Sequence, residues 1–550
     1  MLRMAAQQGK KTVLYLFRND LRVHDNQCLN WAHQNGDHII PLYCFQPEHF
    51  ATTHNFNFRR CGKQRAKFLV ESVTDLRSNL KKLGSNLVVR RESPISAVSD
   101  LIELCSSGNA PIHSVVYHRE VTKEETEQED ELVKICRQRN IHVEPFWGST
   151  LFHVDDLPYK RPSDYPDVYT QFRKGVESRS SVRDIIHTPD ALKSLPPING
   201  GKLGDMPSLK DLGFESDTAD TDARSAFAFK GGESSALQRL NEYLWGTGAV
   251  ATYKETRNGL VGLDYSTKFS PWLANGSISP RRIFHEVKRY EQSEVANQST
   301  YWVIFELIWR DFFRYVSHKF GDRIFLLTGI RDKHLPWKQD KEAFQKWAHG
   351  DTGVPFVDAN MRELLHTGWM SNRGRQNVAS FLVKDLGIDW RMGAEWFESL
   401  LLDHDPCSNY GNWNYSAGIG CDPREDRKFN IIKQALDYDK EGTFVKMWIP
   451  ELGKVPSDKV HFPWRNEGEM KCYDVELGSD YPQPIVVAPE WNKFLGYYNA
   501  GMGSSRGGKG GGGGGRGGGK MGSKGHGKGN YGKGQGPGID FYFKGGSGKK

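Results

Sequence analysis

Residues 369–417 read WMSNRGRQNVASFLVKDLGIDWRMGAEWFESLLLDHDPCSNYGNWNYSA, and this stretch decides how we interpret the second half of the chain. It contains an arginine, Arg375, two aspartates one residue apart, Asp403 and Asp405, an amide, Asn409, and two spaced tryptophans. The aspartates follow an apolar helix, so both carboxylates can meet a polar ring edge at its end. Because burying an unpaired carboxylate is prohibitive, Arg375 is expected to neutralise one of them. Such a set of groups is typical of a buried flavin that exchanges electrons.

The chain has 550 residues, which predicts two domains plus appendages. Its formal net charge of +7 is unevenly distributed, because residues 501–550 contain ten Lys or Arg and a single acid, Asp540. That tail carries +9 of the total and leaves −2 for the rest of the chain. A DNA-binding groove must therefore come from local clustering of charges. The tail also holds 24 glycines and cannot bury a core, so we predict it to be disordered.

The first 150 residues alternate strand-like and helix-like segments. The strand-like segments are TVLYLF, HIIPLYCF, NLVVR, SVVYH and IHVEP. Apolar spacing predicts a helix from Gly62 to Leu83 that stops at Gly84, and a capping box from Thr122 to Glu125 predicts the start of another. Five strands joined by helices indicate a doubly wound parallel sheet. The loop after the first strand, FRNDLRVHDN, has no glycines, which disfavours a standard dinucleotide site there.

The middle of the chain is predicted to be a connector between two domains. Periodicity fails from about residue 172 to residue 231, where Pro, Gly, Ser and Asp are frequent, and we assign residues 151–231 to this connector. Beyond it, apolar residues recur at helical spacing, as in SPRRIFHEVKRYE, where Ser279 is the predicted cap and Pro280 the first helical residue. We therefore expect an α/β domain over residues 1–150, an all-helical domain over 232–500 and a tail over 501–550.

The cysteines and the apolar segments indicate the cellular compartment of the protein. Eight cysteines form no CxxC pair and show no metal-ligand spacing, so reduced thiols in an intracellular protein are expected and no metal site is predicted. No apolar run approaches the roughly 18 to 20 residues of a membrane span. We expect a soluble monomer in the nucleus or cytoplasm, and a short organelle presequence is left open.

Three segments resemble the photolyase and cryptochrome flavoprotein family over about residues 12–495, with the DASH type as the nearest likeness. They are the 369–417 stretch, the opening VLYLFRNDLRVHDN, and YKETRNGLVGLDYSTKFSPWLANGSISPR. The resemblance implies an N-terminal antenna-binding α/β domain and a C-terminal helical FAD-binding catalytic domain.

The resemblance also implies which residues hold cofactors. Those for FAD are Tyr253, Arg257, Ser266, Thr267, Ser270, Asn372, Arg375, Asp403, Asp405 and Asn409, the last facing ring nitrogen N5. The hydroxyls before the Ser-Pro helix start suit a pyrophosphate, although alone they would indicate only a capped helix. Glu120 resembles the ligand of a 5,10-methenyltetrahydrofolate antenna, and its plain alternative is a surface glutamate.

Further residues are implied for electron transfer and for DNA. Trp337, Trp390 and Trp413 match the family's tryptophan triad, although any one of them could simply pack a core. Glu306, Trp309, Gln376 and Tyr415 match a DNA-lesion pocket. Gln376 stands where dimer photolyases commonly have Met, and Tyr415 where they have Trp. Asn372 and Gln376 stand where (6-4) photolyases have a histidine pair, which disfavours that activity.

These features predict a photolyase in which blue light drives an electron from reduced FAD to a cyclobutane pyrimidine dimer. Tyr415 offers less stacking area than Trp to a base that leaves the duplex, so single-stranded DNA is the expected substrate. One alternative is a photoreceptor that signals through its flavin redox state. Another is an RNA-binding protein that acts through its Arg-Gly-Gly tail.

Overall fold

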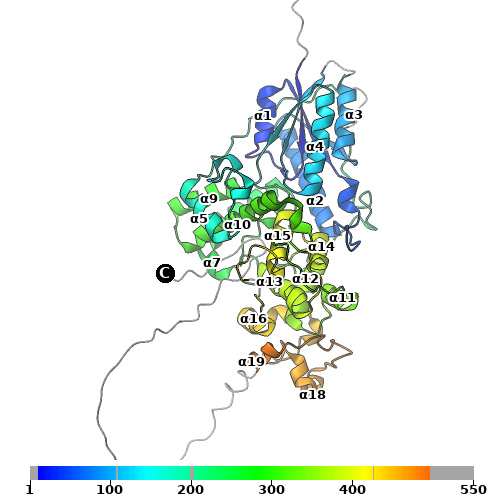
Figure 1. The fold of residues 1–550 in the computed structure, drawn as a ribbon, viewed down its shortest axis with the longest axis vertical. Helices are drawn as coiled ribbons and strands as arrows, with labels where there is room; N and C mark the ends of the chain where they lie inside the picture. Colours follow the sequence, from blue (N-terminus) through cyan, green and yellow to red (C-terminus); the bar gives the residue numbers. More distant parts are fainter. Residues whose placement is uncertain (1–9, 107–109, 198–202, 425–426, 496–550) are drawn as a thin grey trace, which may run out of the picture.

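The computed structural model describes residues 10–106, 110–197, 203–424 and 427–495. An α/β unit lies at the N-terminal side and a helical unit at the C-terminal side (Figure 1), as the sequence predicts. The predicted disorder of residues 501–550 lies outside the described residues. No helix in the described ranges is both long and apolar enough to cross a membrane.

The α/β unit is built on a five-stranded parallel sheet. Its strands are β1 (Thr12–Phe17), β2 (His38–Cys44), β3 (Val88–Arg90), β4 (Ile112–His118) and β5 (His142–Phe146), in the order β3-β2-β1-β4-β5. Every residue of β1 and β2 is buried, which explains their nearly continuous apolar sequences. The predicted doubly wound sheet is confirmed.

Helices cover both faces of this sheet. Val13 and Tyr15 of β1 pack with α1 (Gln27–Asn35) and α2 (Lys63–Lys82), whereas Leu14 and Leu16 pack with α3 (Pro94–Ser106) and α4 (Lys123–Gln138). Alternate residues of one strand thus serve two cores.

Two helix boundaries test the sequence predictions. Helix α2 ends at the predicted place, and Gly84 beyond it has φ +81°. Helix α4 also begins as predicted, with Thr122 as its N-cap. The predicted capping box is wrong, however, because the Thr122 hydroxyl donates to the Glu125 carboxylate at 2.5 Å instead of capping a backbone amide.

The segment predicted as a connector packs along the α/β unit. Leu192, Leu209 and Leu212 join the apolar cluster of the sheet, and the Leu203 carbonyl accepts from the Val89 amide at 2.7 Å. The segment also contains α5 (Tyr169–Arg179), which its polar sequence did not predict.

The helical unit follows. Its α-helices are α6 (Glu233–Asn241), α7 (Tyr253–Thr256), α8 (Ser270–Ala274), α9 (Pro280–Ser293), α10 (Gln298–Phe320), α11 (Lys341–His349), α12 (Pro355–Thr367), α13 (Asn372–Ser380), α14 (Trp390–Leu400), α15 (Pro406–Ala417), α16 (Ile431–Tyr438), α17 (Thr443–Trp448), α18 (Glu467–Met470) and α19 (Asn492–Leu495). Ser279 caps α9 and Pro280 is its first residue, as predicted. Most residues of helix α10 are buried, and the helix packs against α15. Residues 298–320 therefore lie at the centre of the unit.

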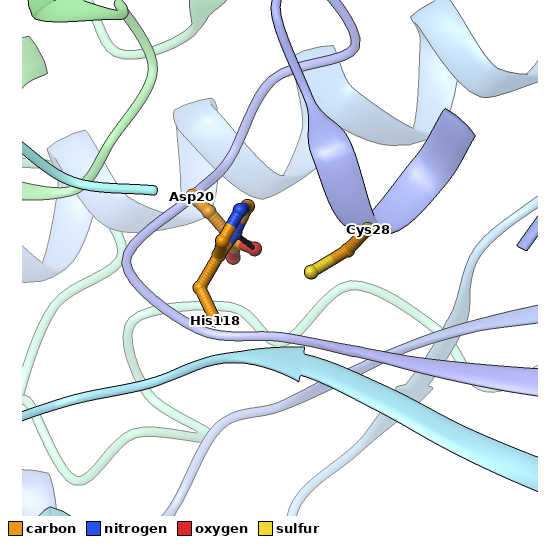
Figure 2. Close-up of side chains that lie close together, drawn as sticks. All are labelled: Asp20, Cys28 and His118. Carbon is orange, nitrogen blue, oxygen red and sulfur yellow. Dashed lines mark hydrogen bonds and ion pairs between the residues drawn. The ribbon is translucent and has the colours of Figure 1, made fainter. Parts of the chain in front are cut away.

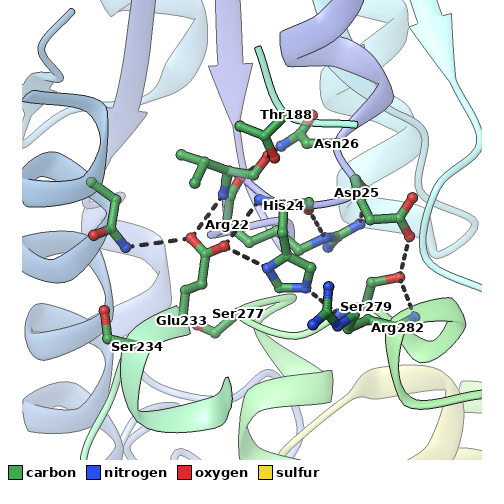
Figure 3. A network of polar contacts seen from close by, with 12 residues as sticks. Arg22, His24, Asp25, Asn26, Thr188, Glu233, Ser234, Ser277, Ser279 and Arg282 are labelled. Carbon is green, nitrogen blue, oxygen red and sulfur yellow. Dashed lines mark hydrogen bonds and ion pairs between the residues drawn. The ribbon is translucent and has the colours of Figure 1, made fainter. Parts of the chain in front are cut away.

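The glycine-free loop after β1 joins the two units (Figure 3). Arg22 donates to the Gly276 carbonyl at 2.9 Å, and Nδ1 of His24 lies 2.5 Å from Oε1 of Glu233. Asp25 pairs with Arg281 at 2.6 Å. The side chains of this loop therefore hold the sheet against α6 and the start of α9.

Candidate active site

A buried ion pair stands where α13 meets the loop after α14. Nη2 of Arg375 lies 2.9 Å from Oδ2 of Asp403, and both side chains are almost fully buried. The Ser270 hydroxyl donates to the same oxygen at 2.6 Å. The predicted neutralisation of one aspartate is thus present, because a guanidinium and a hydroxyl together compensate the buried carboxylate.

Asp403 and Asn409 each carry an acceptor that has no donor among the described residues. The acceptors are Oδ1 of Asp403 and Oδ1 of Asn409, and both atoms are buried. Asn409 uses its Nδ2 to donate to the Ala394 carbonyl at 3.0 Å, which fixes the amide. Buried oxygens without a donor need an explanation, and the N–H groups of a flavin ring edge fit them. We name Arg375, Asp403 and Asn409 the cofactor cluster.

Asp405 differs from Asp403 in its surroundings. It is only partly buried and caps α15, where its Oδ1 accepts from the Ser408 amide at 2.6 Å. Its direct contact with flavin remains a prediction, because the cap already uses one of its oxygens.

The other predicted FAD residues come from several elements. Tyr253 begins α7 and Asn372 begins α13. The carbonyls of Ser266 and Thr267 each accept from the Arg239 guanidinium at 3.1 Å. Arg239 was missed by the sequence analysis, and the only signal was a cation on the apolar side of a predicted helix. The α8 helix after these hydroxyls is only five residues long.

Two further buried ionisable residues were missed. Lys268 has φ +58° and donates from Nζ to the Leu263 carbonyl at 2.8 Å. Burial lowers the pKa of Lys268 well below its usual range. Burial also raises the pKa of Glu363 to about 8, against the opposing charges of Lys268 and Arg375. Both lie in segments whose sequence carries no sign of burial.

Glu306, Trp309, Gln376 and Tyr415, which we name the lesion cluster, are each at most 4% exposed. Glu306 lies 3.4 Å from the Arg257 guanidinium, so this buried carboxyl has a cation as its partner. Trp309 stacks on Tyr169 with ring centroids 3.6 Å apart and meets the Tyr415 ring edge to face at 6.3 Å.

Gln376 joins the same group through Arg373. The Arg373 guanidinium donates to Oε1 of Gln376 and to Oδ1 of Asn258, both at 2.7 Å. Asn258 directly follows Arg257, the partner of Glu306. The four lesion residues, which come from three helices, are therefore brought to one region.

The three tryptophans differ in burial. Trp413 on α15 and Trp390 at the start of α14 are fully buried, whereas Trp337 is partly exposed. A Cβ added to Gly393 would lie 2.2 Å from the Trp413 ring, so α14 and α15 meet closely there. Lys338, the residue after Trp337, exchanges backbone hydrogen bonds with Gly387 and Asp389 at 2.9 and 2.8 Å. Trp337 is thus tied to the start of α14.

Glu120, the predicted folate ligand, faces α10. Its Oε2 lies 2.9 Å from Nη1 of Arg314, and both side chains are largely buried. Glu120 is therefore already paired with a cation of this chain, and its antenna role remains a prediction.

A second polar cluster consists of Asp20 in the loop after β1, Cys28 in α1 and His118 at the end of β4 (Figure 2). Their ligand-type atoms lie within 4.8 Å of one another. Nδ1 of His118 is 2.5 Å from Oδ2 of Asp20, however, which is a hydrogen-bond distance. Two ligands of one tetrahedral zinc ion stand about 3.3 Å apart. We therefore interpret this cluster as hydrogen-bonded.

Known proteins match most of this chain. Residues 302–494 match the FAD binding domain of DNA photolyase, and residues 13–193 match the DNA photolyase domain. The cryptochrome DASH of Xenopus laevis is 56% identical over 492 residues, which cover 89% of this chain and 92% of that protein. The crystal structure of a Synechocystis cryptochrome has 47% identity and a TM-score of 0.83, and covers 90% of this chain and 99% of that one.

A bacterial class III photolyase from Agrobacterium tumefaciens has 30% identity and a TM-score of 0.76, and covers 91% of this chain and 99% of that one. The FAD-binding domain spans the cofactor cluster, so FAD is the cofactor of this unit. The chain therefore belongs to the photolyase and cryptochrome flavoprotein family, in which it groups with the DASH cryptochromes.

Proposed function

We propose that this protein uses blue light and FAD to split cyclobutane pyrimidine dimers, preferentially in single-stranded DNA. The observation that carries the proposal is the pair of buried acceptors on Asp403, the partner of Arg375, and on Asn409, inside the matched FAD-binding domain. When bound, FAD supplies light absorption and reversible transfer of one electron.

In this proposal the cofactor cluster orients the flavin ring. Arg375 and Ser270 hold one oxygen of Asp403 in place, which leaves its other oxygen to accept from a ring N–H. The Ala394 carbonyl holds Asn409 so that its oxygen faces a second ring position. The remaining predicted FAD residues bind the rest of the molecule; they are Tyr253, Arg257, Ser266, Thr267, Asn372 and Asp405.

The lesion cluster would recognise the dimer. Glu306 would donate or accept a hydrogen bond at the dimer, or transfer a proton to it, and the Arg257 guanidinium keeps this side chain in place. Trp309 would stack on the bases. Tyr169 already covers one face of that ring at 3.6 Å, so one face at most remains for a base. Together with the small Tyr415 ring, this favours dimers that are already unstacked.

Electrons and light energy would reach the flavin through the protein. We assign Trp413, Trp390 and Trp337 to the electron path, because Trp413 and Trp390 are fully buried whereas Trp337 is partly exposed. We assign Glu120 to a folate antenna, whose pterin would share this carboxylate with Arg314.

The proposal is tested with a single-stranded oligonucleotide that contains one defined dimer. The FAD-loaded protein should repair it under blue light and leave it unchanged in the dark, and protein stripped of flavin should be inactive under either condition. A photoreceptor is the second candidate, and the deep burial of Glu306, Trp309 and Tyr415 favours it, since signalling needs no access to them. Intact photoreduction without repair would replace the first function by the second.

We also propose that the basic tail, residues 501–550, binds RNA or other nucleic acid inside the cell. Its nine net positive charges follow from the sequence. Deleting residues 501–550 should leave flavin binding and repair in place, lower RNA affinity at low salt, and flatten its salt dependence, because fewer counterions are released. Equal RNA affinity and an equal salt slope in the truncated protein would assign the tail a spacer or solubilising role.

A further inference from the structure

Tyr410 packs directly against one of the three tryptophans. It follows Asn409 on α15, and its ring meets Trp390 edge to face with centroids 6.1 Å apart and planes at 83°. Phe325 packs on it at 4.6 Å, and the side chain is buried. Tyr410 is thus an oxidisable ring in contact with the middle of the proposed electron path.

The Tyr410 hydroxyl leads into a line of ionisable groups. It donates to Oε2 of Glu398 on α14 at 3.0 Å, and Oε1 of Glu398 accepts from Nε of Arg60 at 3.1 Å. Arg60 also pairs with Glu124 at 2.9 Å, and Glu124 contacts His54, whose side chain is 80% exposed. The line therefore runs from a buried phenol to the surface.

We propose that Tyr410 is an additional electron donor to Trp390, with Glu398 as the acceptor of its proton; this inference rests on the proposed path through the tryptophans. After Trp390 has lost an electron towards the photoexcited flavin, one electron passes from Tyr410 to Trp390. The phenolic O–H bond breaks, and its proton forms a new O–H bond on Oε2 of Glu398. The products are neutral Trp390, a neutral tyrosyl radical and a protonated Glu398.

The surroundings suit a step in which proton and electron leave together. Burial, and then the charge of Glu398, raise the pKa of Tyr410 well above its usual range, so the phenol keeps its proton until it is oxidised. Oxidation makes a phenol strongly acidic, and a carboxylate at hydrogen-bond distance can take that proton. When Glu398 becomes neutral, Arg60 keeps Glu124 as a partner, so no buried cation is left uncompensated.

The first test is flash photolysis of the FAD-loaded protein, read by transient absorption and electron paramagnetic resonance. Wild type should show a tyrosyl radical that forms as the Trp radical decays. Tyr410→Phe keeps the ring but should show only the Trp radical, with a severalfold shorter charge-separated state. Tyr481→Phe is the matched control, because this buried tyrosine also bonds a buried carboxylate, Asp358, yet has no ring contact with the three tryptophans among the described residues.

A second variant tests the proton acceptor. Glu398→Gln keeps the size and an acceptor oxygen but cannot take the proton as a carboxylate does. It should abolish the tyrosyl radical, keep the Trp radical, and remove the slowing in D2O that wild type shows. A wild type without a tyrosyl radical, or a tyrosyl radical that persists in Tyr410→Phe, overturns the assignment.

Failure of this inference and failure of the electron path give different results. Trp413→Phe should slow or abolish photoreduction and leave FAD bound, because Phe packs similarly but is much harder to oxidise. Unchanged photoreduction in Trp413→Phe would contradict the path itself. Loss of photoreduction there, with unchanged radical kinetics in Tyr410→Phe, would contradict only the role of Tyr410.

Discussion

The cofactor cluster and the lesion cluster are both buried but differ in the contacts that the protein supplies to them. In the cofactor cluster, Asp403 and Asn409 each present an oxygen that no donor in the described ranges reaches. In the lesion cluster, Glu306 pairs with Arg257 through one carboxylate oxygen, Gln376 pairs with Arg373, and Trp309 stacks on Tyr169.

This difference indicates two kinds of binding. A group that is always bound can complete the hydrogen bonding of its site, whereas a transient substrate must exchange existing contacts for new ones. Binding of a dimer must therefore break existing contacts in the lesion cluster, which costs free energy. A dimer that need not be flipped out of a DNA duplex leaves more binding free energy to offset this cost.

Substitution of Arg375 is expected to have the largest effect on the cofactor cluster. Arg375→Ala leaves Asp403 buried without its cation, so we expect a loss of about 3–5 kcal/mol in stability, together with loss of FAD. Thermal unfolding and the ratio of flavin to protein absorbance measure both effects. Lys346→Ala, which breaks an exposed helical pair with Glu342, should change neither. If Arg375→Ala retains FAD and wild-type stability, the cofactor cluster does not hold FAD.

Glu306 separates the two clusters more finely. Glu306→Gln keeps a hydrogen-bonding group near Arg257 but removes the charge and the transferable proton. We expect repair of a single-stranded dimer to fall by about a hundredfold with FAD retained. Repair rates and flavin content are the readouts. Loss of FAD in step with repair would show that Glu306 acts through Arg257 on the cofactor.

Glu363, whose charge interacts with that of Arg375 in the cofactor cluster, makes stability depend on pH. Its folded pKa of about 8 lies above the ordinary 4.5, so only the folded protein holds this proton between these values. The stability from this group is present at low pH and lost as the pH rises to about 8, by roughly 1.4 kcal/mol per pH unit. Glu363→Gln should show a flatter fall of stability with pH than wild type in chemical denaturation. Glu342→Gln, at an exposed site, should follow wild type; a Glu363→Gln profile that does the same would refute the raised pKa.

Local sequence patterns predicted the strands and helix ends that depend on residues close together in the chain. Apolar spacing gave the strands and helix α2, and the Ser279-Pro280 pair gave the start of α9. The Arg375–Asp403 pair was predictable because both residues belong to one recognisable stretch of sequence.

Contacts between distant segments were not predictable in this way. Arg257 and Glu306 are 49 residues apart, and no spacing rule joins them. Tyr169 lies in a segment that looked like a connector, so its stacking on Trp309 had no signal. The capping-box prediction at Thr122 failed for a local reason, because the hydroxyl donates to the Glu125 carboxylate instead of accepting from a backbone amide.

The preference for single strands is tested by comparing repair of one dimer in single-stranded DNA, in an intact duplex and in a mismatched bubble, at equal salt. Extraction from a duplex costs a few kcal/mol. An uncompensated 3 kcal/mol reduces duplex affinity by roughly a hundredfold. We predict light-dependent repair of the single strand, weak or no repair of the duplex, and partial recovery in the bubble. Equal repair of all three substrates would contradict this preference.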